Sequence, residues 1–211
     1  MIEDSNQRRE QCQKQAKLCQ SKFNVPALSS HEWLQQQETS SDWILVDVRT
    51  APERRVSMIR GAKTLAEFDQ EWRAGTFPPS TKVAFYCTIG YRSGIHASKY
   101  VRRLEGRVYN LDGIVAFSQA VVDRFMTHRT PNPSDWLIDP HSGAPTNGVH
   151  TFGALWNFVD TEIFLGVYYS RPALLVRMLQ VGFSASGHHA REGLYFLKRI
   201  ASRRKSRHKH S

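Results

Sequence analysis

The sequence predicts an α/β fold with a largely parallel sheet, and its apolar pattern carries that prediction. Short apolar runs, each bounded by polar residues, lie at residues 44–48, 83–86 and 108–111. Such runs are typical of strands that are buried on both faces, as in parallel sheets. Helical patterns separate these runs, and strands that alternate with helices at short spacing indicate βαβ units. In such sheets, functional sites form where the carboxyl ends of strands lead into helices.

The start of the chain is polar. Residues 1–22 are rich in Gln and Lys and have no apolar stripe wide enough to dock firmly, so we expect a flexible N-terminal arm, either a frayed helix or disordered. Order is predicted to begin near Phe23. Ser29 and Glu32 have the spacing of a capping box, which predicts the start of a helix just before Trp33.

Two amphipathic helices are predicted in the middle of the chain. The first spans about residues 92–104, and the second follows Gly113. Both show apolar residues at the spacing of one helical face. These residues are Ala97, Tyr100, Val101 and Leu104 in the first helix, and Ile114, Phe117, Val121 and Phe125 in the second.

The last part of the chain has a different composition from the α/β region. Residues 127–150 contain four Pro and two Gly, which predicts a long irregular segment. Helices are expected over residues 171–182, with Pro172 in the first turn, and over about residues 189–202. We therefore divide the chain into an arm (1–22), an α/β domain (23–126), a C-terminal extension (127–197) and a basic tail (198–211).

The formal net charge of +10 is concentrated at the ends. Residues 198–211 hold seven Lys and Arg and no acid, whereas residues 23–197 hold 17 basic and 16 acidic side chains. Charge runs of this length occur in nuclear-localisation and RNA-contacting patches, although many are solvated chain ends. We expect at most a weak nucleic-acid or nuclear-import contact through this tail.

Composition excludes several classes of protein. A hydrophobic content of 40% is too high for a disordered chain, and the sequence has no apolar window of membrane-spanning length. The N-terminus lacks the apolar core of a signal peptide, and three Cys do not form a disulfide framework. His188 and His189 have no partners at metal-ligand spacing. We expect a soluble cytoplasmic protein, with the nucleus as a second location, and no metal, cofactor or membrane partner.

The residues that suggest chemistry follow the second apolar run, in the order Cys87-Thr88-Ile89-Gly90-Tyr91-Arg92-Ser93. A loop between a strand and a helix N-terminus can turn several backbone N–H groups toward one negative charge. In that field, beside a guanidinium, a thiol pKa can fall from about 8.5 to about 3.5–7.5, which makes the sulfur a nucleophilic thiolate. The simpler alternative is that Cys87 is a small buried residue at a strand end.

This loop and three other motifs resemble the single-domain rhodanese (sulfurtransferase) family. The resemblance covers about residues 23–126 and implies a parallel five-stranded sheet flanked by helices, here followed by an irregular and helical C-terminal extension. In chain order the motifs are Leu45-Val-Asp-Val-Arg49-Thr-Ala-Pro-Glu53, Ile59-Arg-Gly61-Ala62, Tyr86-Cys-Thr-Ile-Gly-Tyr-Arg-Ser93 and Tyr109-Asn-Leu-Asp-Gly113.

The resemblance also implies an activity. Cys87 would take a sulfane sulfur from a small donor such as thiosulfate and pass it, from a persulfide, to a thiol or to cyanide. Arg92 would attract the donor anion and keep Cys87 ionised. Asp47 and Arg49 would brace the loop, although an ordinary strand-end salt bridge is an equal alternative. The substrate-binding loop would comprise Thr88, Ile89, Gly90, Tyr91 and Ser93.

Two other functions stay open. Rhodanese-like phosphatases and arsenate reductases have five residues between Cys and Arg, whereas only four separate Cys87 from Arg92. We interpret the shorter loop as a fit to one sulfur. The second alternative is a non-catalytic binding module, since a fold does not guarantee its chemistry. Cys12 and Cys19, about 10 Å apart along a helix, would be either spare surface thiols or relay thiols.

Overall fold

The computed structural model describes residues 2–37, 42–129 and 131–184. The helix predicted over residues 189–202 and the basic tail predicted over 198–211 lie outside the described residues.

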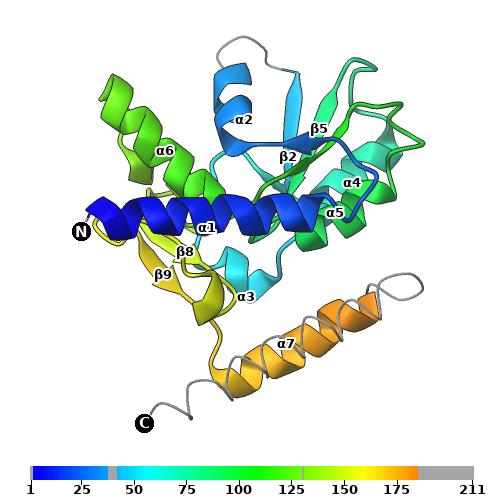
Figure 1. The fold of residues 1–211 in the computed structure, drawn as a ribbon. Helices are drawn as coiled ribbons and strands as arrows, with labels where there is room; N and C mark the ends of the chain where they lie inside the picture. Colours follow the sequence, from blue (N-terminus) through cyan, green and yellow to red (C-terminus); the bar gives the residue numbers. More distant parts are fainter. Residues whose placement is uncertain (1, 38–41, 130, 185–211) are drawn as a thin grey trace. The chain divides into compact units, whose positions relative to one another are not determined.

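A parallel five-stranded sheet forms the centre of the structure (Figure 1). The strand order β1-β6-β5-β2-β4 places β5 in the middle, where it pairs in register with β2 from Trp43↔Lys82 to Asp47↔Tyr86. The α/β fold class predicted from the apolar runs is thereby confirmed. The strands are β1 (Ala27–Leu28), β2 (Trp43–Asp47), β4 (Lys63–Thr64), β5 (Lys82–Tyr86) and β6 (Val108–Leu111).

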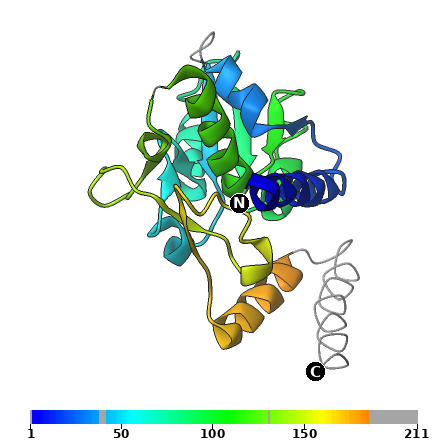
Figure 2. The same ribbon diagram turned by 60° about the vertical axis from the view of Figure 1, so that its left-hand side comes forward.

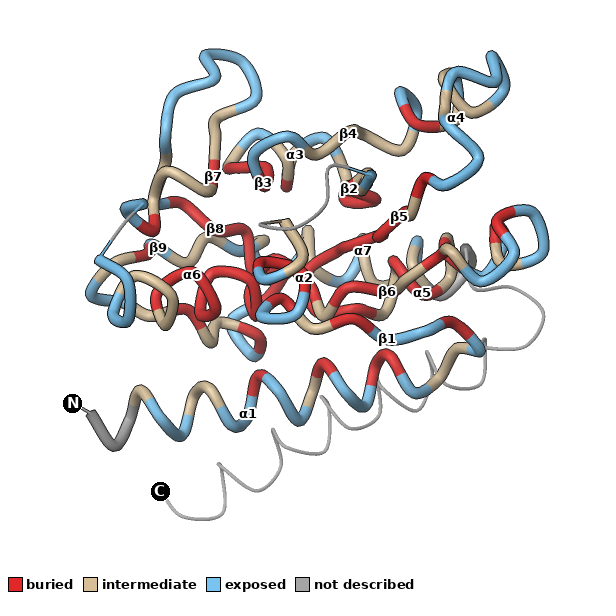
Figure 3. The backbone as a smooth tube through the Cα atoms, turned by 90° about the horizontal axis from the view of Figure 1, so that it is seen from above, coloured by how far each residue is buried: buried red, intermediate tan, exposed pale blue. Residues whose placement is uncertain are grey.

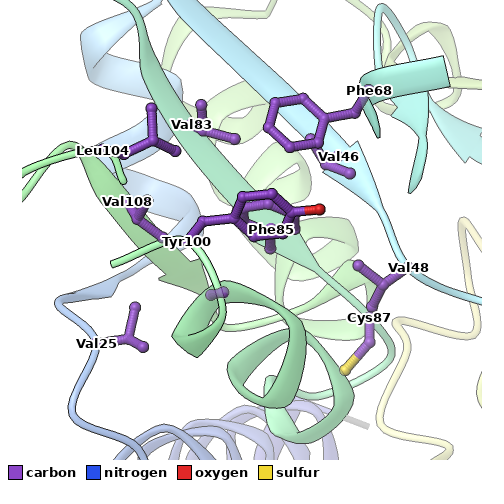
Figure 4. Close-up of a cluster of buried hydrophobic side chains, with 11 residues drawn as sticks. Val25, Val46, Val48, Phe68, Val83, Phe85, Cys87, Tyr100, Leu104 and Val108 are labelled. Atoms are coloured by element: carbon purple, nitrogen blue, oxygen red, sulfur yellow. The ribbon is translucent and has the colours of Figure 1, made fainter. Parts of the chain in front are cut away.

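Helices flank the sheet, with α4 and α5 on one face and α2 and α6 on the other (Figures 1 and 2). Alternate strand residues Val83 and Phe85 join one apolar cluster with Phe68 of α4 and Ala97 of α5 (Figure 4). The α2 helix begins with the predicted capping box at Ser29. The helices are α1 (Ile2–Gln20), α2 (Ser30–Gln36), α3 (Ala51–Arg54), α4 (Leu65–Ala74), α5 (Tyr91–Ser98) and α6 (Ile114–His128).

The N-terminal segment differs from the expected flexible arm. It forms helix α1, which contacts α5 and α6, and buried stretches recur along it (Figure 3). Its buried apolar residues are Cys12, Ala16 and Cys19, at the i, i+4, i+7 spacing of one helical face, and Gln20 is buried beside them. We missed this stripe because its members are small, so they let the helix approach closely without a strongly hydrophobic pattern. An ion pair between Arg9 and Asp123 of α6 joins the same contact.

The helix predicted over residues 92–104 is shorter than expected. The α5 helix ends at Ser98, and the chain continues in tight turns such as the bond from Tyr100 N–H to the Ala97 carbonyl (2.9 Å). Tyr100 and Leu104 are nevertheless buried, as the apolar stripe requires. A succession of tight turns can therefore bury the same stripe that we interpreted as a continuous helix.

The segment predicted to be irregular contains short elements that join it to the sheet domain. β7 (Leu137–Ile138) pairs antiparallel with β3 (Met58–Ile59), and β8 (Gly148–His150) pairs in parallel with β9 (Leu165–Val167). Strands of two or three residues are too short to show a period in the sequence. Two 3₁₀ helices, Pro133–Trp136 and Ala154–Trp156, complete the segment.

The described residues up to Tyr168 form one compact unit, and the described residues from Tyr169 onward belong to a second. The first unit thus includes both the sheet and the segment that follows α6. In the second unit, the described part is helix α7 (Arg171–Ser184), where the sequence predicted a helix over 171–182. Its Leu175 and Val176 side chains are exposed.

Asp112, at the end of β6, should make stability depend on pH. Its carboxylate accepts hydrogen bonds from the backbone N–H (3.0 Å) and the hydroxyl of Ser30, at the start of α2. Burial raises the pKa of Asp112 to about 7 despite these bonds. An acid whose pKa is higher in the folded state stabilises the fold at low pH and loses that contribution as the pH rises from about 4 to about 7.

We therefore expect the free energy of unfolding of the wild type, relative to Asp112→Asn, to fall between pH 4 and pH 7. Denaturant unfolding of both proteins across this range measures the difference. The subtraction is needed because burial lowers the pKa of His96 and of His150 to about 4, which contributes a slope of opposite sign. A difference that stays constant with pH would contradict the prediction.

Candidate active site

The candidate site is the loop between β5, the central strand, and the first turn of α5. Gly90 is the N-cap residue of α5 and has a φ of 87°, a backbone conformation that favours glycine. The start of α6 is hydrogen-bonded to this loop, because Ile114, the residue after Gly113, donates its N–H to the Cys87 carbonyl (2.9 Å). The backbone N–H groups of the first helical turn have no acceptor within the helix, so they are available to a negative charge in the loop.

Cys87 lies at the start of this loop and is only 1% exposed. Its side chain belongs to the apolar cluster between the sheet and helices α4 and α5, and Figure 4 shows the sulfur turned away from the ring of Phe85. The Ser93 hydroxyl lies 3.5 Å from the Cys87 sulfur, in position to donate a hydrogen bond to it. Cys87 and Ser93, both predicted site residues, are thus in contact through the Cys87 sulfur.

Arg92 has a partner that we did not assign to it from the sequence. Its Nη1 and Nη2 donate to the two carboxylate oxygens of Glu53 at 2.7 and 2.5 Å, and Nη2 also donates to the Thr88 hydroxyl at 3.1 Å. The guanidinium lies over the ring of Phe152 (4.9 Å to the centroid). Glu53 therefore balances the charge of Arg92. Both terminal nitrogens of the Arg92 guanidinium already have hydrogen-bond partners.

The pKa values agree with an ionised pair. Burial would raise the pKa of Glu53, but the charge and hydrogen bonds of Arg92 hold it well below its ordinary value. Burial would likewise lower the pKa of Arg92, but Glu53 holds it well above its ordinary value. Both groups stay charged at any pH at which the protein would be assayed.

A second buried ion pair lies beneath the strand end. Arg49 donates from Nη2 to Asp47 Oδ2 (2.7 Å) and to the Ser57 carbonyl (2.6 Å), and both charged side chains are fully buried. The Tyr86 hydroxyl donates to Asp47 Oδ2 (2.7 Å) and accepts from the Ile59 N–H (3.1 Å). This network holds Tyr86, the residue before Cys87. The bracing role expected of Asp47 and Arg49 stays a prediction.

Of the remaining predicted loop residues, Gly90 lies against the last turn of α1, and Tyr91 contacts Phe23 just after that helix. The Tyr91 ring meets the Phe23 ring edge to face, with centroids 5.5 Å apart. Ile89 and Gly90 are buried. The structure thus brings Cys87, Thr88, Arg92 and Ser93 together and directs Tyr91 toward the end of α1.

Glu53, Phe152 and Gln20 are site neighbours that our sequence reasoning did not select. Glu53 could have been found, because Thr50 and Glu53 have capping-box spacing and Glu53 ends a motif we quoted. Phe152 and Gln20 reach the site from distant segments, and no local pattern marks them. Among the described residues, no cluster of His, Cys, Asp and Glu could hold a metal ion. In the same part of the chain, no helix combines the length and apolar character needed to span a membrane.

Comparisons with known proteins identify the class. Residues 30–120 match the family model described as Rhodanese-like domain, and the resemblance seen in the motifs is thereby confirmed. No curated protein matches.

Several solved structures are similar over part of the chain. A thiosulfate sulfurtransferase from Pseudomonas aeruginosa is 19% identical (TM-score 0.41), with 50% of this chain and 21% of that chain covered. The Bacillus anthracis protein CoADR-RHD is 23% identical (TM-score 0.38; 47% and 18% covered). A Rhodopseudomonas palustris protein of unknown function, described as a possible tyrosine phosphatase, is 21% identical (TM-score 0.39; 52% and 89% covered). The chain thus spans about a fifth of the length of the first two.

Proposed function

We propose that this protein is a sulfurtransferase that carries a sulfane sulfur on Cys87. The observation that carries the proposal is the position of the Cys87 sulfur, at the end of the central strand, beside the first turn of α5 and within 3.5 Å of the Ser93 hydroxyl. Helix N–H groups and a hydroxyl stabilise a thiolate and, after transfer, a persulfide anion in the same place.

The reaction has two steps. The Cys87 thiolate attacks the outer sulfur of a donor such as thiosulfate, the sulfur–sulfur bond of the donor breaks, and sulfite leaves with the bonding electron pair. The resulting Cys87 persulfide then gives its outer sulfur to a thiolate or to cyanide, and the Cys87 thiolate is restored. This is a ping-pong scheme with a covalent intermediate.

Arg92 has a different role in this scheme from the one we first expected. Because its guanidinium is paired with Glu53, the loop N–H groups supply most of the field around the sulfur, and Arg92 holds the loop in shape as a positioning residue. The same pairing disfavours a phosphatase. A phosphatase needs an arginine fork for a tetrahedral oxyanion, and this fork holds a carboxylate instead.

Mass spectrometry after incubation with thiosulfate tests the proposal. At the earliest times after mixing, we expect the wild type to gain one sulfur on the peptide that contains Cys87, and Cys87→Ser to gain none. Cys12→Ser is the control, because Cys12 is a buried cysteine of α1 and should not carry the sulfur. Labelling that persists in Cys87→Ser would contradict the mechanism. Hydrolysis of phosphotyrosine analogues without sulfur uptake would favour the phosphatase, and inertness toward both would favour a binding module.

A further inference from the structure

The last turn of α1 is fastened to the loop that carries Cys87. Gln20 donates from Nε2 to the carbonyls of Asn110 (2.6 Å) and Leu28 (3.1 Å), and Asn110 donates from Nδ2 to the Gly90 carbonyl (2.8 Å). A methyl group added at Gly90 would lie 3.1 Å from Gln20 Cγ and 3.8 Å from the Ala16 carbonyl oxygen. The turn formed by residues 16–20 and the Cys87 loop are therefore in direct contact. The helix that follows this loop, α5, contacts α1, and Figure 1 shows the two helices near each other.

Cys19 belongs to this turn and is 5% exposed. Burial raises the pKa of Cys19 to about 12, and the charge of Cys87 contributes in the same direction. Cys12, two turns earlier on the same face of α1, is also buried, but the charge that acts on it is that of Asp112. Cys19 is thus the buried thiol of α1 that lies in the turn packed against the Cys87 loop.

The family match begins at residue 30, so α1 precedes the matched domain. With Cys87 only 1% exposed, a donor can reach its sulfur only if part of the cover moves. Displacement of the 16–20 turn would expose Cys19 to water and open the side of the Cys87 loop at Gly90. Hydration removes the main cause of the raised pKa of Cys19, which then moves back toward the ordinary thiol value of about 8.5.

We propose that Cys19 is a second reactive thiol of this site, which attacks the Cys87 persulfide and resolves it into a Cys19–Cys87 disulfide. The inference rests on the proposed function, since it needs a persulfide on Cys87. The Cys19 thiolate attacks the inner sulfur, the bond between inner and outer sulfur breaks, and the outer sulfur leaves as hydrosulfide with the bonding pair. An external dithiol then reduces the disulfide, is itself oxidised to a disulfide, and restores both thiols.

A single-turnover experiment on the full chain tests this assignment. The reduced protein is freed of reductant, loaded with thiosulfate and desalted, and hydrosulfide release and non-reduced peptide masses are followed without any added thiol. We expect the wild type to release about one hydrosulfide per persulfide formed and to yield a peptide pair joined through Cys19 and Cys87. We expect Cys19→Ser and Cys19→Ala to keep the persulfide and to release almost no hydrosulfide.

Cys12→Ser is the matched control, because it removes a buried thiol from the same face of the same helix and should behave as the wild type. The joined peptide in the wild type requires no variant, so the test does not depend on how well the Cys19 variants fold. If the wild type holds its persulfide as long as Cys19→Ala and no joined peptide forms, the inference is wrong while the sulfurtransferase proposal stands. If no variant gains a sulfur from thiosulfate, the proposed function itself fails.

Discussion

Glu53→Gln is expected to lower the free energy of unfolding by about 3–5 kcal/mol, the range measured when one member of a buried ion pair is removed. The substitution keeps the size of the side chain but removes the charge that balances Arg92, and Glu53 is fully buried. Arg92, whose side chain is only 13% exposed, would then keep its positive charge without its carboxylate partner. Denaturant unfolding of the wild type and the variant at pH 7 measures the difference.

Glu71→Gln is the matched control. Glu71 forms an ion pair of similar length with Lys63 (2.8 Å), but both side chains are 36% exposed. Exposed pairs contribute about 0–1 kcal/mol, so this variant should remain close to the wild type. Equal losses in the two variants would show that burial does not set the strength of the Glu53 pair.

The Glu53 pair also has a pH signature. The pKa of Glu53 is lower in the folded state than in the unfolded state. The stabilisation that the ionised Glu53 contributes is therefore complete above the ordinary Glu pKa of about 4.3 and is lost as the pH falls below that value. The stability difference between wild type and Glu53→Gln should therefore shrink only in acid. This direction is opposite to that expected of Asp112.

Gly113→Ala is expected to disrupt the Cys87 loop and to abolish sulfur uptake. Gly113 has a φ of 106°, and a methyl group there would lie 2.4 Å from the Thr88 carbonyl oxygen. Backbone does not yield as a flexible side chain does, so the loop or the start of α6 must move. Uptake of sulfur from thiosulfate, measured on the folded fraction of the variant, reports that movement.

Gly106→Ala separates conformational strain from the steric clash. Gly106 also has a positive φ, 80°, but no atom lies within 4 Å of a methyl group placed there. The Gly106→Ala substitution should lower the free energy of unfolding by only about 1–2 kcal/mol, the penalty for a non-glycine residue in the left-handed region. Sulfur uptake by the folded protein should stay unchanged. A Gly113→Ala protein that takes up sulfur normally would show that the loop tolerates displacement.

The sequence predicted best what local patterns encode. The runs at 44–48, 83–86 and 108–111 became the three central strands, because a short continuous apolar run has few other stable arrangements in a parallel sheet. The position of Cys87 between strand and helix followed from the same reasoning. Local sequence patterns are therefore sufficient to locate the candidate nucleophile.

The surroundings of Cys87 were much less predictable. Glu53, Gln20 and Phe152 reach the loop through contacts between distant segments, and their sequence neighbours say nothing about those contacts. The docking of α1 was missed because small side chains and hydrogen bonds from Gln20 replace the broad apolar face that periodicity detects. The sequence pattern suggested that Arg92 binds a substrate anion. It did not reveal the buried carboxylate of Glu53, which comes from a distant segment and pairs with Arg92.

The almost complete burial of Cys87 has a kinetic consequence. A reagent that cannot reach the sulfur in the closed state reacts only with a minor open population, so its apparent rate is the intrinsic rate multiplied by the open fraction. An opening free energy of about 3 kcal/mol would slow every thiol reagent by somewhat more than a hundredfold. The equilibrium between the closed and open states would thus slow the oxidation of Cys87 by small oxidants, without any change in the intrinsic reactivity of its sulfur.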